Sequence, residues 1–128
     1  MKILVVDDEE DVQMLFQQRF RKEIKSGKVE FQFAISGESA LEYLQNGGCQ
    51  KIAQIFSDIN MPDMNGIELL KRIKEKYENL KVSMITAYED EDYLKEAQVH
   101  GCEDYFTKPL NFDSLKQKIF NTGQNNRE

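Results

Sequence analysis

The feature of this chain that most constrains its fold is a repeated alternation between short apolar runs and longer segments with helical spacing. The first run, residues 3–6, is apolar at every position, which is typical of a strand buried on both faces of a parallel sheet. The segment after it carries apolar residues at helical spacing, namely Val12, Leu15, Phe16, Phe20 and Ile24. A strand followed by a helix is the repeating unit of an α/β fold, so the opening of the chain favours that class.

The same unit recurs to the end of the chain. Further strands are predicted at 29–35, 52–56, 82–85 and 105–106, and each precedes a segment with helical spacing. Ser36 and Asn111 indicate helix starts, and His100 before Gly101 is interpreted as the residue that ends the fourth helix rather than as a general base. We therefore expect an α/β fold with a five-stranded parallel sheet and five helices on both of its faces, joined by right-handed crossovers.

Composition argues against several functional classes. The chain has 17 basic and 23 acidic residues and a net charge of −6, without a basic stripe, so it is a poor candidate for direct nucleic-acid binding. No apolar run approaches the ~20 residues of a membrane helix, and we expect neither a membrane segment nor a secretory signal. Cys49 and Cys102 lack metal-ligand spacing, so we interpret them as reduced thiols of a cytoplasmic protein.

Polar residues follow four of the five predicted strands. Asp7 and Asp8 follow the first, Asp58 the third, Thr86 the fourth and Lys108 the fifth. Each has a simpler explanation when taken alone: a helix N-terminus, a turn, a helix cap or a solvated loop charge. Because the carboxyl ends of parallel strands meet at one edge of the sheet, we expect all of them to lie close together.

Together these groups have a chemical logic. Clustered carboxylates repel one another unless a cation joins them, and hard oxygen ligands with open positions suit Mg²⁺. A carboxylate beside such a metal can act as a nucleophile toward phosphorus and form an aspartyl phosphate. A metal, an ammonium group and a hydroxyl group then hold the oxygens of the transferred group, as phosphoryl transfer requires.

The ordered set of motifs resembles the receiver domain of two-component response regulators. The motifs are Val-Val-Asp-Asp-Glu at 5–9, Asp-Ile-Asn-Met-Pro-Asp-Met-Asn-Gly at 58–66, Thr-Ala at 86–87 and Lys-Pro at 108–109. The resemblance runs from about Lys2 to about Phe120. It implies a flavodoxin-like sheet with strand order 2-1-3-4-5, a receiver domain over residues 1–122, and a polar C-terminal tail or linker stub over residues 123–128.

The resemblance also implies a metal-dependent phosphorylation site. Asp58 corresponds to the phosphoacceptor and contributes to the metal site, and Asp8 corresponds to the direct Mg²⁺ ligand. Asp7 corresponds to the acid that holds the metal, often through water, and Asn60 to the position whose backbone carbonyl binds it. Mn²⁺ is expected to substitute for Mg²⁺. Asn60 also occupies one of the positions that tune dephosphorylation.

Further roles concern the response to phosphorylation. Thr86 corresponds to the switch hydroxyl, Lys108 to the lysine that pairs with phosphate, and Tyr105 to an aromatic residue that turns inward on activation. The bond between Lys108 and Pro109 corresponds to a cis peptide of the family. Tyr88 is at the second position that tunes dephosphorylation, where we expect the ring to shield the acyl phosphate, so that Tyr88→Ala shortens its lifetime.

The function implied is a signalling switch that catalyses only its own phosphorylation and dephosphorylation. The implied phosphodonor is a sensor histidine kinase or a histidine phosphotransfer protein. The fourth helix, the fifth strand and the fifth helix form the implied output face toward a downstream protein or output domain. Tyr93, Lys95 and Gln98 belong either to that face or to plain solvated surface. A monomer or a phosphorylation-dependent dimer is expected.

Three alternatives remain at this point. A haloacid-dehalogenase-type phosphatase also uses Asp, Thr and Lys, but its nucleophilic aspartate follows the first strand and its acidic pair comes late in the chain. In this chain the acidic pair Asp7-Asp8 follows the first strand, and Asp58 follows the third. A flavin or nucleotide binder needs hydrogen-bond donors after the first strand, where this chain has Asp-Asp-Glu-Glu. An interaction module that is not phosphorylated is opposed by the intact Asp58, Thr86 and Lys108.

Overall fold

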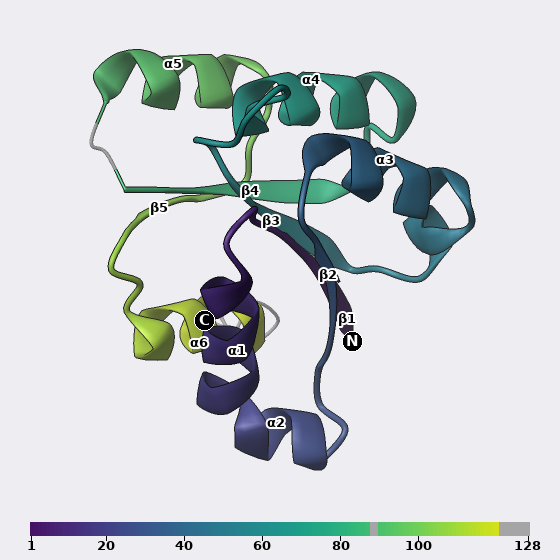
Figure 1. Cartoon of the computed structure of the whole chain (residues 1–128), viewed down its shortest axis with the longest axis vertical. Coiled ribbons are helices and arrows are strands. Elements are labelled where there is room, and N and C mark those ends of the chain that lie inside the picture. Colours follow the sequence, from purple (N-terminus) through teal and green to yellow (C-terminus); the bar gives the residue numbers. More distant parts are fainter. Residues whose placement is uncertain (88–89, 121–128) are drawn as a thin grey trace, which may run out of the picture.

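The computed structural model of this chain describes residues 1–87 and 90–120. Five parallel strands form one sheet in the order β2-β1-β3-β4-β5 (Figure 1). The strands are β1 (Lys2–Val6), β2 (Glu30–Ala34), β3 (Gln54–Asp58), β4 (Lys81–Thr86) and β5 (Tyr105–Thr107). The predicted α/β class and the strand order implied by the resemblance are confirmed.

The described part of the chain has six α-helices rather than the predicted five. They are α1 (Glu10–Arg19), α2 (Arg21–Lys25), α3 (Gly37–Gln45), α4 (Gly66–Lys76), α5 (Glu91–Val99) and α6 (Phe112–Phe120), and a short 3₁₀ helix η1 (Gly48–Gln50) follows α3. The additional helix arises because the first predicted helix is divided at Phe20. Backbone hydrogen bonds from Phe20 to Phe16 and from Ile24 to Phe20 continue across the division, so it is a local distortion and not a loop.

The helices cover the two faces of the sheet with different kinds of residue (Figure 1). On one face, α3, α4 and α5 pack aliphatic and methionine side chains against β1, β3 and β4. On the other face, which we call the aromatic face, α1 and α6 pack phenylalanine side chains together with aliphatic ones. Six rings are linked by pairwise contacts and form what we call the phenylalanine cluster: Phe16, Phe20, Phe31, Phe33, Phe112 and Phe120.

The apolar stripe of the first predicted helix is only partly buried. Phe16 and Phe20 are completely buried, whereas Leu15 is 38% exposed and Ile24 is 37% exposed. The division at Phe20 places Ile24 in the separate helix α2, which contributes no buried residue, and Leu15 lies at the surface of α1.

Helix ends follow the predicted signals. The Ser36 hydroxyl accepts a hydrogen bond from the Ser39 backbone in a capping box, and the Asn111 side chain accepts one from the Ser114 backbone. His100 is the C-terminal cap of α5, as predicted. Within residues 1–87 and 90–120, no helix has the length and apolar composition needed to cross a bilayer.

Candidate functional site

The carboxyl edge of the sheet brings the predicted polar residues together. Asp7 directly follows β1, Asp58 and Thr86 are the last residues of β3 and β4, and Lys108 directly follows β5. One carboxylate oxygen each from Asp7, Asp8 and Asp58 lies within 4.8 Å of the others. The predicted convergence is therefore confirmed. We call these three aspartates together with Lys108 the acid pocket.

The acid pocket holds carboxylates in a largely buried setting. Asp7 is 4% exposed and Asp58 is 5% exposed, while Asp8 is exposed. Burial and then the charge of Asp7 raise the pKa of Asp58 from 3.8 to about 6, against the opposing effects of Lys108 and the Asn60 backbone N–H. Negative charge at this edge is therefore incompletely balanced by the protein itself.

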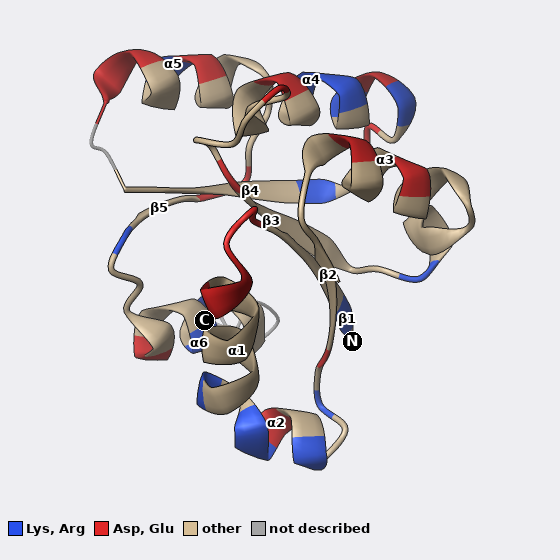
Figure 2. Cartoon of the chain, viewed as in Figure 1, with Lys and Arg blue, Asp and Glu red and all other residues tan. Residues whose placement is uncertain are grey.

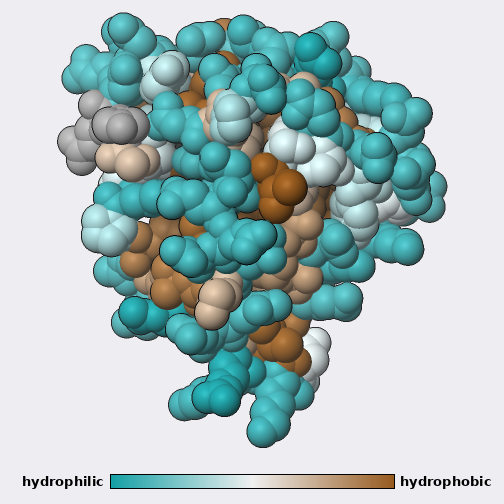
Figure 3. All heavy atoms as spheres, viewed as in Figure 1, coloured by the Kyte–Doolittle hydropathy of each residue, from teal (hydrophilic) through white to brown (hydrophobic). Residues whose placement is uncertain are grey.

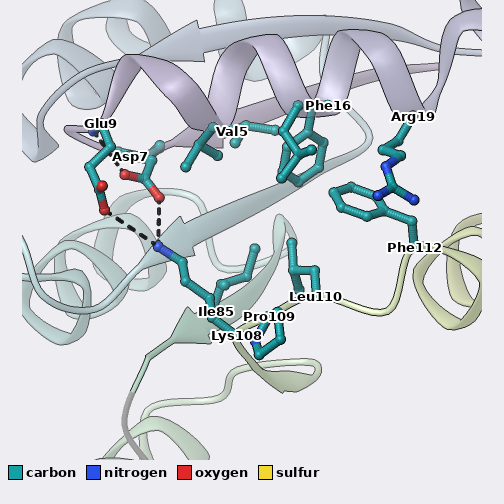
Figure 4. Close-up of a pocket in the computed structure, with 13 residues that line it drawn as sticks. Val5, Asp7, Glu9, Phe16, Arg19, Ile85, Lys108, Pro109, Leu110 and Phe112 are labelled. Carbon is teal, nitrogen blue, oxygen red and sulfur yellow. Dashed lines mark hydrogen bonds and ion pairs between the residues drawn. The ribbon is translucent and has the colours of Figure 1, made fainter.

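Lys108 is the cation that the protein supplies to this cluster. Its Nζ lies 3.2 Å from Asp7 Oδ2 and 3.8 Å from Asp58 Oδ2. It also lies 3.9 Å from Glu9 Oε1, and Figure 4 shows Glu9 and Asp7 converging on the Lys108 ammonium. Burial acts to lower the pKa of Lys108, but the carboxylates of Asp58, Asp7 and Glu9 outweigh it and the pKa is raised.

The backbone holds Lys108 in place beside β4. Its N–H donates to the Thr86 carbonyl at 2.7 Å, which extends the pairing between β4 and β5 by one hydrogen bond. The peptide bond between Lys108 and Pro109 is cis, as the resemblance implies. The ammonium group thus reaches the acid pocket from the C-terminal end of β5, which pairs with β4 up to Thr86.

Glu9 is a participant that the sequence reasoning did not single out. Its side chain is 66% exposed, and its backbone N–H donates to Asp7 Oδ1 at 2.9 Å. The available signal was its place as the third acid after β1, although its contact with Lys108 depends on a loop a hundred residues away. Figure 2 shows how acidic residues gather where β1 leads into α1, in contrast to the basic α2.

The loop from β3 to α4 closes the other side of the acid pocket. The Asn60 side-chain amide donates to the Thr86 hydroxyl at 3.4 Å. Gly66 begins α4 so close to β3 that a Cβ at this position would collide with the backbone of Asp58 and Ile59. The Asn65 side chain accepts from the Glu68 backbone and caps α4, which fixes where the loop ends.

Other predicted site residues lie apart from this cluster or outside the described residues. Tyr105 opens β5 in register with Met84, two residues before Thr86, and packs against the aliphatic side of the sheet. Burial is the largest cause that raises the pKa of Tyr105. Tyr93 also packs there, whereas Lys95 and Gln98 are exposed. Tyr88 and the predicted tail at 123–128 lie outside the described residues.

The donor set fits a hard divalent cation. Three carboxylates within reach of one another supply the oxygen ligands that Mg²⁺ prefers, and the exposed Asp8 leaves the cluster accessible from solvent. Burial and then the charge of Asp7 raise the pKa of Asp58, and a bound cation would oppose both effects by stabilising the ionised carboxylate. The Lys108 ammonium adds a second positive group at the same place, which suits an incoming anion.

Comparisons with known proteins agree with this geometry. The model of the response regulator receiver domain family matches residues 3–120. Sporulation initiation phosphotransferase F of Bacillus subtilis is 34% identical over 118 residues, which cover 92% of this chain and 90% of that protein. Chemotaxis protein CheY-3 of Vibrio cholerae is 36% identical over 121 residues, covering 93% and 88%. The solved CheX-CheY-BeF3-Mg complex from Borrelia burgdorferi matches with a TM-score of 0.83 at 29% identity, covering 93% of this chain and 86% of that chain.

Proposed function

Since this chain belongs to the family of response regulator receiver domains, we propose that it is a phosphorylation switch in which Asp58 is the phosphoacceptor. Receiver domains are signalling switches of two-component systems, and they bind Mg²⁺ at an acidic site. The observation that carries the proposal is the position of Asp58, which is buried at the end of β3 close to Asp7 and Lys108. The family match favours this function over the phosphatase and flavin-binding alternatives.

The chemistry is an in-line transfer onto the carboxylate. An Asp58 oxygen attacks phosphorus, a P–O bond forms, and the bond between phosphorus and the donor's imidazole nitrogen breaks, so that the donor leaves as neutral histidine after taking up a proton. Lys108 Nζ, 3.8 Å from Asp58 Oδ2, pairs with an oxygen of the transferred group. The Thr86 hydroxyl donates to another oxygen, which draws Thr86 toward the phosphoryl group.

Four groups hold the metal in this proposal. They are the carboxylates of Asp7, Asp8 and Asp58 and the backbone carbonyl of Asn60, with Asp8 as a direct ligand. When bound, Mg²⁺ neutralises the carboxylates and the phosphoryl oxygens, and Mn²⁺ serves in its place. Support comes from the spacing of the three carboxylates and from the β3–α4 loop, which Gly66 draws close to the end of β3.

The donor is proposed to be a sensor histidine kinase or a histidine phosphotransfer protein, the partners with which receiver domains interact. His100 is not part of the transfer, because it caps the C-terminal end of α5 and so lies away from the carboxyl edge of the sheet. Beyond its own phosphorylation and dephosphorylation, which Asn60 and Tyr88 tune, no enzymatic activity is proposed. The proposed setting is cytoplasmic.

The output face is proposed to be α5, β5 and α6, which correspond to the fourth helix, fifth strand and fifth helix expected from the sequence. Thr86 is joined to the residue after β5 by its backbone hydrogen bond with Lys108, which provides a path from the acid pocket to β5. The Tyr105 hydroxyl is buried without a hydrogen-bond partner in the described part of the chain, which favours a change of its position on activation. A downstream protein, an output domain or a second copy then reads this face.

Phosphorylation by acetyl phosphate with Mg²⁺, followed by intact mass spectrometry, tests the proposal. We expect the parent chain to gain the mass of one phosphoryl group and Asp58→Asn to gain none. Asp63→Asn is the matched control, because Asp63 is an exposed acid of the same loop and is expected to behave as the parent does. Equal modification of parent and Asp58→Asn would contradict the assignment of the acceptor.

A further inference from the structure

A groove that adjoins the acid pocket at Asp7 and Lys108 runs from there between α1 and the segment that joins β5 to α6 (Figure 4). Its volume is about 500 Å³, within the range of about 300–1,000 Å³ that is usual for small-molecule sites. Most of its lining is apolar: Val5, Val12, Leu15, Phe16, Ile85 and Leu110. Figure 3 shows hydrophobic residues gathered over this part of the molecule, with hydrophilic residues around them.

The two ends of the groove differ in charge. At one end, Lys108 is already occupied by Asp7, Asp58 and Glu9. At the other end, the Arg19 guanidinium lies 5.5 Å from the centre of the Phe112 ring, and no carboxylate within the described residues forms an ion pair with it. Figure 4 shows Arg19 far from Asp7 and Glu9. Without bound metal, the carboxylates around Lys108 leave the first end net negative, so the anionic group of a ligand is favoured at Arg19 instead.

We propose that this groove binds a small amphipathic organic anion, with its apolar body along α1 and its anionic group on Arg19. The apolar lining supplies the driving force, because the body of such a molecule leaves water when it enters. The guanidinium selects for the anion and fixes its orientation. The proposal accounts for Leu15, an apolar residue of α1 that lines the groove and is 38% exposed.

Two dyes with closely similar apolar bodies provide the test. The first is 8-anilino-1-naphthalenesulfonate, which carries an anionic sulfonate, and the second is uncharged N-phenyl-1-naphthylamine. We expect saturable one-to-one binding of the sulfonate by fluorescence, with backbone amide shifts in NMR confined to α1 and residues 108–112. Arg19→Gln should weaken the binding of the sulfonate dye by about three- to fivefold and leave the affinity for the uncharged dye unchanged. Leu15→Asp should weaken the binding of both dyes by about tenfold or more.

The controls separate this site from the phosphorylation site and from general dye binding. Arg72→Gln removes an exposed arginine that pairs with Glu68 on the opposite face of the sheet, and it should change nothing. In the absence of Mg²⁺, Asp58→Asn should bind the sulfonate as the parent does, so failure of the proposed phosphorylation leaves this inference standing. Non-saturable binding, or equal binding by parent and Arg19→Gln, overturns it. Absence of binding also overturns it and leaves the groove to an apolar segment of a protein partner.

Discussion

The acid pocket and the phenylalanine cluster lie on neighbouring parts of one sheet and are built on opposite principles. In the acid pocket, three carboxylates crowd within 4.8 Å of one another, with Lys108 as the balancing cation. In the phenylalanine cluster, each ring is stabilised by others, with centroids 4.9 to 6.4 Å apart. The comparison shows that the site is held together against its own repulsion by a scaffold whose stability comes from elsewhere.

The largest effect is expected where the scaffold is removed. Phe20 is fully buried and contacts the rings of Phe16, Phe31, Phe112 and Phe120. Phe20→Ala should lower the free energy of unfolding by about 3–5 kcal/mol, because it leaves a cavity among rings that cannot collapse around it. Urea unfolding measures the change. Met14→Ala, at a residue 59% exposed on the same helix segment, should stay within about 0.5 kcal/mol. Similar losses for both variants would remove the distinction between scaffold and surface.

In the acid pocket, removal of a charged side chain should raise the free energy of unfolding rather than lower it. The folded state raises the pKa of Asp58 from 3.8 to about 6, so it binds this proton more tightly than the unfolded state does. The favourable contribution is complete below pH 3.8 and is lost as the pH rises through about 6. Without metal at pH 7.5, Asp58→Asn should therefore raise the free energy of unfolding, by up to about 3 kcal/mol.

Urea unfolding in EDTA at pH 7.5 and pH 5 measures this effect of Asp58→Asn. The gain should be smaller at pH 5, where the parent carboxyl group is largely protonated. Asp63→Asn, which removes an exposed charge from the same loop, should show neither the gain nor its pH dependence. A parent that is more stable than Asp58→Asn in EDTA at pH 7.5 would contradict the repulsion inferred for the acid pocket.

Mg²⁺ should reduce the repulsion between carboxylates that distinguishes the acid pocket from the phenylalanine cluster. A ligand that binds only the folded state at a hundred times its dissociation constant stabilises it by about 2.7 kcal/mol. We expect Mg²⁺ to raise the Tm of the parent in a thermal melt and to raise the Tm of Asp58→Asn less. K⁺ at matched ionic strength provides the control for simple screening. A parent Tm that does not respond to Mg²⁺ would argue against the proposed metal site.

The same contrast explains what could be predicted from the sequence. Parallel topology alone brings the ends of β1, β3, β4 and β5 to one edge, so the meeting of Asp7, Asp58, Thr86 and Lys108 followed from the order of strands and helices. The bounds of β3 did not, because pairing with β4 extends the strand to Asp58, beyond the apolar run that predicted it. The division at Phe20 and the contact of Glu9 with Lys108 depend on tertiary packing, which no local pattern encodes.

Two buried serines sharpen the comparison with the smallest expected effects. Ser57 is 0% exposed, and its hydroxyl donates to the Asp58 carbonyl at 2.9 Å. Ser83 is 1% exposed and lies two residues before Ile85 on the aromatic face, and its hydroxyl has no hydrogen-bond partner among the described residues.

Ser57→Ala should lower the free energy of unfolding by about 1 kcal/mol, because it removes a hydrogen bond that is made. Ser83→Ala should raise it by up to about 1 kcal/mol, because it removes a buried polar group that is not satisfied. Urea unfolding of both variants at one pH gives the two signs. Destabilisation by Ser83→Ala equal to that by Ser57→Ala would mean that the aromatic face, like the acid pocket, depends on a polar contact.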